Sequence, residues 1–226
     1  MVSSFSPDLI NRDYEVKVGD YFSRGWEIFK QQAPLFILFT VLLLVAQVPL
    51  LILPAPLGAG GGEDSPGGGI LTFVFNVIAP ALTAGYYFVA FQLARGRSAV
   101  FGDFFQGFNK FLPIFLTALV SGILIAIGLV LLILPGIYLI VAYLFAQPLV
   151  IDKGADFWQA METSRQLITK KWFSFFGLLL LIFLLNFVGA IPLGLGLLIT
   201  IPFSVCIIAA AYEDIVGLNS VAEVGL

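Results

Sequence analysis

Side chains that could perform chemistry are scarce in this chain. Its 226 residues include 11 basic and 14 acidic residues, one Cys and no His. Because His is the commonest general base and a favoured metal ligand, most catalytic and metal-binding arrangements are excluded. Cys206 has no second Cys with which to form a disulfide in the chain. The sequence therefore predicts a protein that is not an enzyme and has no metal or cofactor.

Two pairs of adjacent carboxylates come closest to an acid–base pair. Glu63-Asp64 follows a run of glycines, and Glu213-Asp214 follows a long apolar stretch. The two carboxylates of each pair are neighbours in sequence and lie outside the apolar segments, so we interpret them as solvated charge. The Gly-rich stretch 58–69 has glycines but lacks the Lys of a phosphate-binding loop, and we interpret it as a flexible linker.

Two groups of polar residues remain as candidates for binding. Asn76 and Asn186 are amides in the middle of long apolar stretches, where they either hydrogen-bond between helices or line a path for a polar ligand. The second group flanks the apolar stretches, at the level of anionic lipid headgroups: Arg95, Arg97, Lys170 and Lys171. The need to fix the membrane orientation would also account for these basic residues.

The overall composition is that of an integral membrane protein. Hydrophobic residues make up 60% of the chain and charged residues 11%, against about 45 to 50% and roughly 25% in a soluble domain. The formal net charge of −3 argues against a nucleic acid as partner, because nucleic-acid binders carry a basic excess. The charged residues before residue 33 interrupt any apolar run, so we expect no secretory signal peptide.

Four uncharged blocks are long enough to hold membrane-spanning helices, which require about 20 residues each. Two of them predict single crossings, at 34–53 and 70–94. The other two, 111–151 and 172–212, contain 41 residues each, about twice the necessary length, and must fold back. Pro135-Gly136 and the stretch 192–196 supply the turns. Helix 136–151 is short, so we expect it to continue past Ile151 into the interface or to be met by local thinning of the bilayer.

The basic residues predict the orientation of these six crossings. All 11 Lys and Arg residues lie before the first crossing, between the second and third, or between the fourth and fifth. By the positive-inside rule, both termini face the cytoplasm. We expect a multi-pass protein of a bacterial inner membrane or an equivalent internal membrane.

Related residues recur in the three basic segments. Asp20, Asp103 and Asp156 are each followed by two aromatic residues, and each begins a stretch with apolar side chains at helical spacing. We predict a single all-α domain, residues 1–226, in which three cytoplasmic amphipathic helices each precede a transmembrane hairpin. The repeat units are 18–94, 99–151 and 155–212, with tails at 1–17 and 213–226. Each Asp would lie in the first turn of its helix, and the aromatic residues would fasten that helix to its own hairpin.

Three short motifs extend this pattern: LPGIY at 134–138, AQPLVIDKG at 146–154 and AMETSR at 160–165. In these motifs the chain resembles a broad family of bacterial six-helix membrane proteins, which includes the integral-membrane domain attached to some glycerophosphodiester phosphodiesterases. The resemblance covers residues 18–214 and implies the six-helix fold. It carries no catalytic residue onto this chain, because the attached soluble domain performs the hydrolysis.

Two functions are compatible with these features. The first is a non-enzymatic membrane module that organises or assists membrane lipids or other membrane proteins. The alternative is a transporter or permease for an apolar or lipid-like solute. A transporter would need a cavity that reaches the middle of the bilayer, lined by groups such as Asn76 and Asn186. The sequence leaves the oligomeric state open.

Overall fold

The computed structural model describes residues 13–52 and 66–219, and for residues 48–52 and 66–71 it describes the backbone only. All regular structure in the described part of the chain is helical, as predicted. Five of the described helical segments are long and apolar enough to cross a membrane, or six if one bent pair counts as a single span. The fold is therefore that of an all-α, multi-pass membrane protein.

The first helices meet at a sharp corner. Helix α2 (Val18–Gln31) lies at 85° to α3 (Ala33–Ile52), with the bend at Gln32. Helix α4 (Pro66–Ala94) runs through Pro80 without a break. The predicted linker 58–69 is outside the described residues up to position 65, and its last four residues form the first turn of α4.

The second long apolar block folds back earlier than predicted. Helix α5 (Phe111–Leu131) ends and α6 (Ile133–Ala142) begins around an extended Leu132, so the prediction of a turn at Pro135-Gly136 was wrong. Pro135 is the third residue of α6. Backbone N–H groups in the first turn of a helix have no acceptor within the helix, so the missing N–H of Pro135 costs no hydrogen bond there. Gly128 and Gly136 let the two helices approach closely, because a Cβ on Gly128 would lie 2.9 Å from the Gly136 nitrogen and one on Gly136 would lie 2.7 Å from the Leu129 nitrogen.

The second helical segment of this block is interrupted. It continues past Ile151 to Lys153, as predicted, but residues 143–145 form a turn between α6 and α7 (Ala146–Lys153). Pro148 cannot donate to the carbonyl four residues earlier, which favours a break at this point. The Ser164 hydroxyl donates to the Ala142 carbonyl at 2.7 Å and accepts from the Phe145 N–H at 3.0 Å, satisfying both sides of the break.

The last block is divided into two helices by a turn at the place that the sequence predicts. Helix α8 (Phe157–Thr169) leads into α9 (Trp172–Ala190), and a turn at residues 191–196 leads into α10 (Leu197–Ile215). Leu193 and Gly194 in this turn have φ angles of +52° and +80°. Glycine adopts this left-handed conformation without a steric penalty.

The three predicted amphipathic segments are not equivalent. The middle one, η1 (Phe101–Lys110), is a 3-10 helix. Asp20 lies in the first turn of α2, and Asp103 accepts from the Val100 N–H at 2.8 Å at the start of η1. Asp156 instead precedes α8 as its N-cap and accepts from the N–H groups of Trp158 and Gln159. The shared Asp is thus a helix-start residue in two positions, the third residue of α2 and of η1 and the N-cap of α8.

All three segments pack chiefly on helices outside their own hairpin, and α8 lies against α5, α6 and α7. Helix α2 lies chiefly against α10, and η1 lies chiefly against α4. The contact with α4 is very close, because a Cβ on Gly107 would come 2.0 Å from the Ala81 carbonyl oxygen and one on Gly85 would come 1.9 Å from that of Phe104. The prediction that each segment is fastened to its own hairpin was therefore wrong for α2, η1 and α8.

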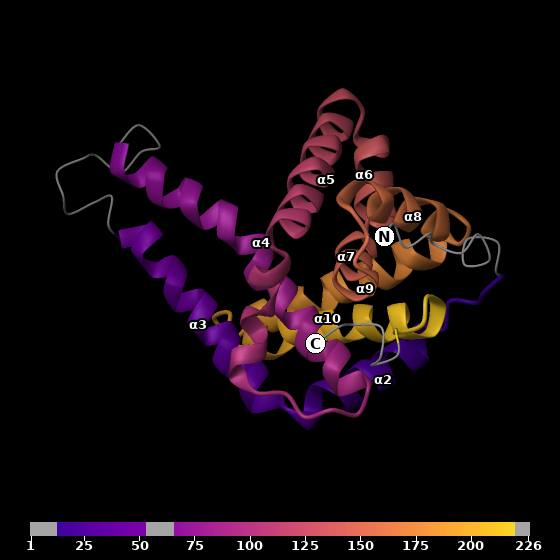
Figure 1. Ribbon diagram of the computed structural model, residues 1–226, viewed down its shortest axis with the longest axis horizontal. Helices are drawn as coiled ribbons and strands as arrows, with labels where there is room; N and C mark the ends of the chain where they lie inside the picture. Colours follow the sequence, from indigo (N-terminus) through magenta and orange to yellow (C-terminus); the bar gives the residue numbers. More distant parts are fainter. Residues whose placement is uncertain (1–12, 53–65, 220–226) are drawn as a thin grey trace.

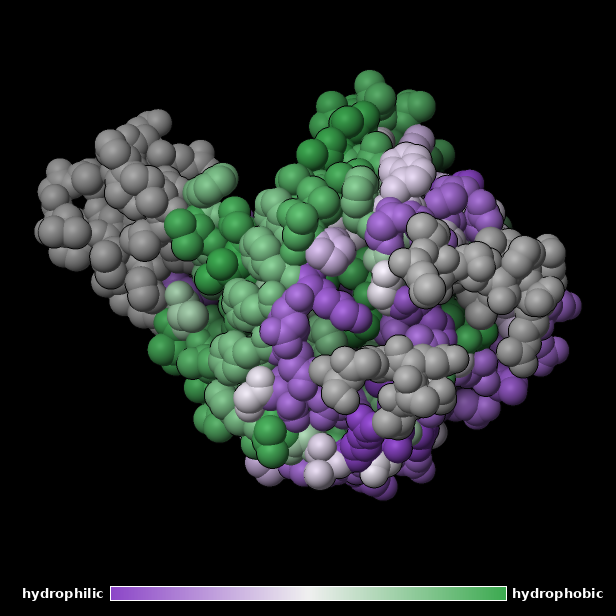
Figure 2. Space-filling model, viewed as in Figure 1, coloured by the Kyte–Doolittle hydropathy of each residue, from purple (hydrophilic) through white to green (hydrophobic). Residues whose placement is uncertain are grey.

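The hairpins diverge from a common base. Figure 1 shows α3 and α4 extending away from α5 and α6, while α10 crosses behind the ends of these helices. Figure 2 shows hydrophobic residues over the α3–α4 and α5–α6 hairpins and hydrophilic residues over α2, α8 and the end of α10. On the face seen in this view, the hydrophilic residues are thus gathered on one side.

Candidate functional site

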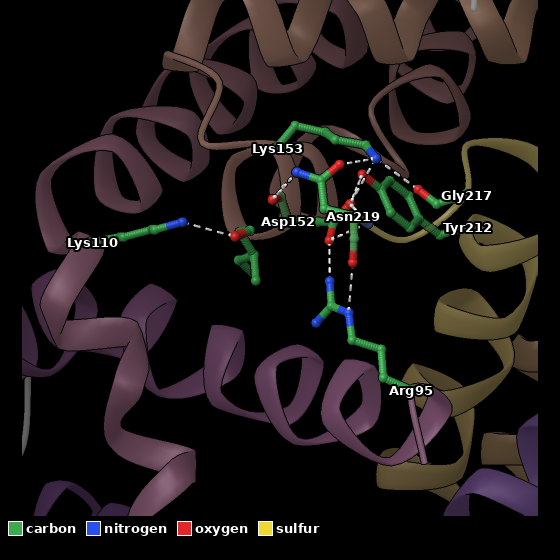
Figure 3. A network of polar contacts seen from close by, with 8 residues as sticks. Arg95, Lys110, Asp152, Lys153, Tyr212, Gly217 and Asn219 are labelled. Carbon is green, nitrogen blue, oxygen red and sulfur yellow. Dashed lines mark hydrogen bonds and ion pairs between the residues drawn. The ribbon is translucent and has the colours of Figure 1, made fainter. Parts of the chain in front are cut away.

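A buried carboxylate lies where α4, α7 and α10 end. Asp152 is the seventh residue of α7, and its side chain has no exposed surface. A carboxylate taken out of water needs strong compensation from charges and hydrogen-bond donors. We therefore take its surroundings as the candidate functional site (Figure 3).

Four groups compensate the Asp152 carboxylate. Arg95, just beyond α4, donates to Oδ1, and the Lys153 ammonium lies 3.2 Å from Oδ2. The Tyr212 hydroxyl donates to Oδ2 at 3.2 Å, and the Asn219 N–H lies 3.3 Å from both oxygens. Opposite charges and hydrogen-bond donors around a buried carboxylate offset the cost of taking it out of water.

The C-terminal segment closes the same cluster. The Asn219 amide donates to the Asp152 carbonyl at 3.1 Å and accepts from Lys153, which also donates to the Gly217 carbonyl at 2.8 Å. Arg95 Nε donates to the Asn219 carbonyl at 3.2 Å. Both cations therefore bind the C-terminal segment and Asp152 at once.

A further contact ties the second hairpin to this cluster. Lys110, the last residue of η1, donates to the Ile151 carbonyl at 2.9 Å (Figure 3). The cluster thus joins four separate parts of the chain: the end of α4, the start of α5, the end of α7 and the segment after α10. Because the oxygens of Asp152 are engaged by protein donors, the arrangement is suited to holding helices together.

A second charged contact lies between α2 and α10. Arg24 donates to both oxygens of Glu213 at 3.1 and 3.2 Å, and the Tyr21 hydroxyl donates to Asp214 at 3.0 Å. The pair Glu213-Asp214, interpreted above as solvated, is therefore used in packing, although Asp214 is exposed. Open cavities of about 310 and 260 Å³ lie beside these residues.

The predicted lipid-contacting residues separate into two kinds. Arg95 belongs to the Asp152 cluster and is mostly buried. Arg97 is exposed in the connection after α4. Lys170 and Lys171 are exposed at the end of α8, and the Lys171 ammonium lies 3.9 Å from Asp13. Arg97, Lys170 and Lys171 are therefore the three that present basic groups at the surface.

The structure does not bring Asn76 and Asn186 together. Asn76 is exposed on α4 and donates to the Thr72 carbonyl of its own helix at 2.8 Å. Asn186 lies between α9 and α10, where it donates to the Ile182 carbonyl and to the Ser204 hydroxyl at 2.9 and 2.7 Å. Neither amide lines either of the two cavities. The predicted polar path is not formed by this pair.

The residues of this cluster that the sequence analysis missed are Asp152, Lys153, Tyr212 and Asn219. One signal was available for Asp152, which is the first charged residue after an uncharged block of 41 residues. No sequence pattern indicates that Tyr212 and Asn219 meet it, because they are 60 and 67 residues away. Among the described residues, no group of three His, Cys, Asp or Glu side chains could hold a metal ion.

Comparisons of the chain with protein-family models, with curated proteins and with solved structures found no match.

Proposed function

We propose that the chain is a non-enzymatic integral-membrane module that organises or assists membrane lipids or other membrane proteins. The observation that carries this proposal is the Asp152 cluster, in which a buried carboxylate is fully engaged by Arg95, Lys153, Tyr212 and Asn219. These groups join helices and present no free nucleophile or base to a substrate. A scaffold that must stay assembled in a membrane uses buried polar contacts in this way.

The proposed placement puts the charged side of the molecule in the cytoplasm. Basic residues flank the apolar helices on that side, which supports cytoplasmic termini and hairpins that enter the membrane from the cytoplasm. Helix α2, bent by 85° from α3 and with exposed Trp26, has the geometry of an interfacial helix. The proposed location is a bacterial inner membrane or an equivalent internal membrane.

The partners that fit this placement are anionic lipids. Arg97, Lys170 and Lys171 are exposed on the charged side, at the ends of apolar helices. A basic side chain near an anionic membrane surface contributes about 1 kcal/mol to lipid attraction. Other membrane proteins remain partners under the same proposal, because the exposed apolar helices offer them packing surfaces.

One observation favours the alternative of a transporter for an apolar or lipid-like solute. Between α9 and α10, Asn186 Oδ1 and Thr200 Oγ1 are buried and lack a hydrogen-bond partner. Unsatisfied polar atoms inside a membrane protein are costly and can mark a ligand path. A solute with a hydroxyl or amide group would supply the missing hydrogen bonds.

Reconstitution distinguishes the two functions. The protein would be placed in liposomes with and without an anionic phospholipid, and its retained lipid measured by mass spectrometry after mild detergent extraction. We expect enrichment of the anionic lipid, reduced in a variant combining Arg97→Gln, Lys170→Gln and Lys171→Gln. Lys17→Gln, at another exposed position, is the matched control. Equal lipid retention by all variants would contradict lipid organisation.

The same liposomes test the alternative. A fluorescent lipid analogue in one leaflet would report movement across the bilayer. If the protein is a module and not a transporter, the lipid analogue should cross the bilayer at the same rate as in protein-free liposomes. A protein-dependent rate that is lost in Asn186→Leu would instead establish the transporter.

A further inference from the structure

The tip of the α5–α6 hairpin is entirely apolar and open to its surroundings. Its five residues, Val130 to Leu134, are each between 67% and 86% exposed. The Leu132 N–H donates back to the Gly128 carbonyl at 3.1 Å, so the turn satisfies this donor within the hairpin. An exposed apolar tip with an internally bonded N–H is suited to hydrocarbon and unsuited to water.

Helix α8 lies alongside this hairpin, and its position shows how far the hairpin extends beyond it. Two contacts fix its position: Ser164 bridges the break at Ala142 and Phe145, and the Thr169 and Tyr138 hydroxyls lie 2.7 Å apart. Helix α8 therefore runs antiparallel to α6, and the C-terminal end of α8 lies nearest the tip of the hairpin. Helix α8 also contacts α5, so it flanks both legs of the hairpin.

The charged end of α8 lies close to the tip. Lys170 and Lys171 directly follow Thr169, and the next residue, Trp172, donates from its indole to the Tyr138 carbonyl at 3.3 Å. Tyr138 is six residues after Leu132, which corresponds to about 9 Å along a helix. The hairpin therefore extends about 9 Å beyond a layer of Lys, Trp and Tyr residues, the residue types that mark a membrane interface.

This distance is much shorter than the hydrocarbon core, which is about 30 Å thick. Length and composition alone would allow α5 to cross the membrane. However, a full crossing by the hairpin would immerse the charged face of α8, including the Glu162–Arg165 pair, in hydrocarbon. The position of α8 therefore decides against a crossing. Helix α9, by contrast, begins at the interface residue Trp172, and its 19 residues extend about 28 Å.

We propose that the α5–α6 hairpin is a re-entrant membrane anchor, which enters the cytoplasmic leaflet and does not emerge on the far side. Its ligands are the acyl chains of phospholipids, which surround residues 130–134. Lys170, Lys171 and Trp172 lie at the headgroups of the same leaflet. This inference rests on the membrane placement given under the proposed function and changes the number of crossings from six to four.

Cysteine accessibility tests this anchor. Single-cysteine variants are made on a Cys206→Ala background, at the tip (Leu132→Cys), in the α3–α4 connection (Ser65→Cys) and on exposed α2 (Ser23→Cys). A membrane-impermeant maleimide is applied to intact cells and to inverted membrane vesicles. We expect Ser65→Cys to react only in cells and Ser23→Cys only in vesicles. Leu132→Cys should react in neither until detergent is added.

A depth measurement provides an independent readout. A fluorophore attached at Leu132→Cys should be quenched more strongly by a phospholipid with a nitroxide on its acyl chain than by one with a nitroxide on its headgroup. Labelling of Leu132→Cys in intact cells, or strongest quenching from the headgroup, would overturn the re-entrant anchor. Failure of Ser65→Cys to react in cells would instead overturn the proposed orientation. The quenching measurement at Leu132→Cys would still report the depth of the tip.

Discussion

Arg95 and Asp152 form an ion pair across 57 residues of sequence, and the carboxylate in this pair has no exposed surface. Arg95 follows α4, whereas Asp152 lies near the end of α7. The pair therefore fixes the first hairpin relative to the second. Around it, Lys153, Tyr212 and Asn219 add the end of α10 and the C-terminal segment.

Removing the charge of Asp152 should destabilise the protein strongly. Asp152→Asn leaves Arg95 and Lys153 without their carboxylate, and breaking a buried pair costs about 3 to 5 kcal/mol. Unfolding in detergent can be followed by the reaction of the single, buried Cys206 with a thiol-reactive dye on heating. Asp103→Asn at a helix start is the control and should cost about 1 kcal/mol or less. Equal unfolding temperatures for the two variants would contradict a role of Asp152 in assembly.

A methyl group at Gly85 should disrupt the packing of η1 on α4. Its Cβ would lie 1.9 Å from the Phe104 carbonyl oxygen, and backbone atoms cannot move aside as a flexible side chain can. We expect Gly85→Ala to lower stability by about 3 kcal/mol, at the upper end of overpacking costs. Gly122→Ala, where a Cβ meets nothing within 4 Å, should leave the unfolding temperature unchanged or raise it. A stable Gly85→Ala protein would show that η1 is not held against α4.

The Ser164 hydroxyl should be required for the broken helix. Ser164→Ala removes the acceptor of the Phe145 N–H and the donor to the Ala142 carbonyl, and both backbone groups are buried. An unsatisfied buried group costs about 1 to 3 kcal/mol. Hydrogen exchange measured by mass spectrometry should show faster exchange at residues 143–146. Ser23→Ala on the exposed side of α2 serves as control, and unchanged exchange in Ser164→Ala would contradict the capping role.

The Glu162–Arg165 pair should make a small pH-dependent contribution to stability. Arg165 donates two hydrogen bonds to Glu162, at 2.6 and 2.8 Å, and these hold the pKa of Glu162 below its ordinary value. A carboxyl group whose pKa is lowered by folding stabilises the protein above its ordinary pKa, and this contribution is lost as the pH falls through the lowered pKa.

Comparison with Glu162→Gln tests this contribution. Both side chains of the pair are 39% exposed, so solvent screening limits the effect to about 1 kcal/mol or less. The unfolding temperature of the natural protein should exceed that of Glu162→Gln at pH 7, and the difference should shrink on acidification. Glu15→Gln, at another exposed carboxylate, is the control. A difference that grows at low pH would contradict the prediction.

Much of the fold follows from local properties of the chain. Long uncharged stretches give the apolar helices, and the turn at 191–196 follows from a cluster of Pro and Gly that cannot continue a helix. The predicted turn at Pro135 lies three residues after the observed one at Leu132. Pro is tolerated in the first turn of a helix as well as in the connection between two helices, so its position does not distinguish the two. The break before Pro148 was missed because its stability depends on Ser164, which lies in another helix.

The candidate site was less predictable than the fold. Arg95 could be selected from the sequence because it flanks an apolar stretch, but its role could not. A basic residue at the end of a membrane helix either faces lipid headgroups or pairs with a carboxylate, and the two cases look the same in sequence. Asn76 and Asn186 were grouped because both are mid-helix amides, whereas their helices place them in different surroundings.

By itself, the sequence determined that this protein is all-helical, lies in a membrane and keeps its basic residues at the ends of its apolar segments. These properties depend on composition and on spacing along a single helix, and hydrocarbon enforces them wherever the helix lies. The tertiary structure alone decided that Asp152 is buried against Arg95, that α2 packs on α10, and that α8 lies alongside the α5–α6 hairpin. Such contacts join residues tens of positions apart, and the chain reaches them through the packing of whole helices, which no local pattern encodes.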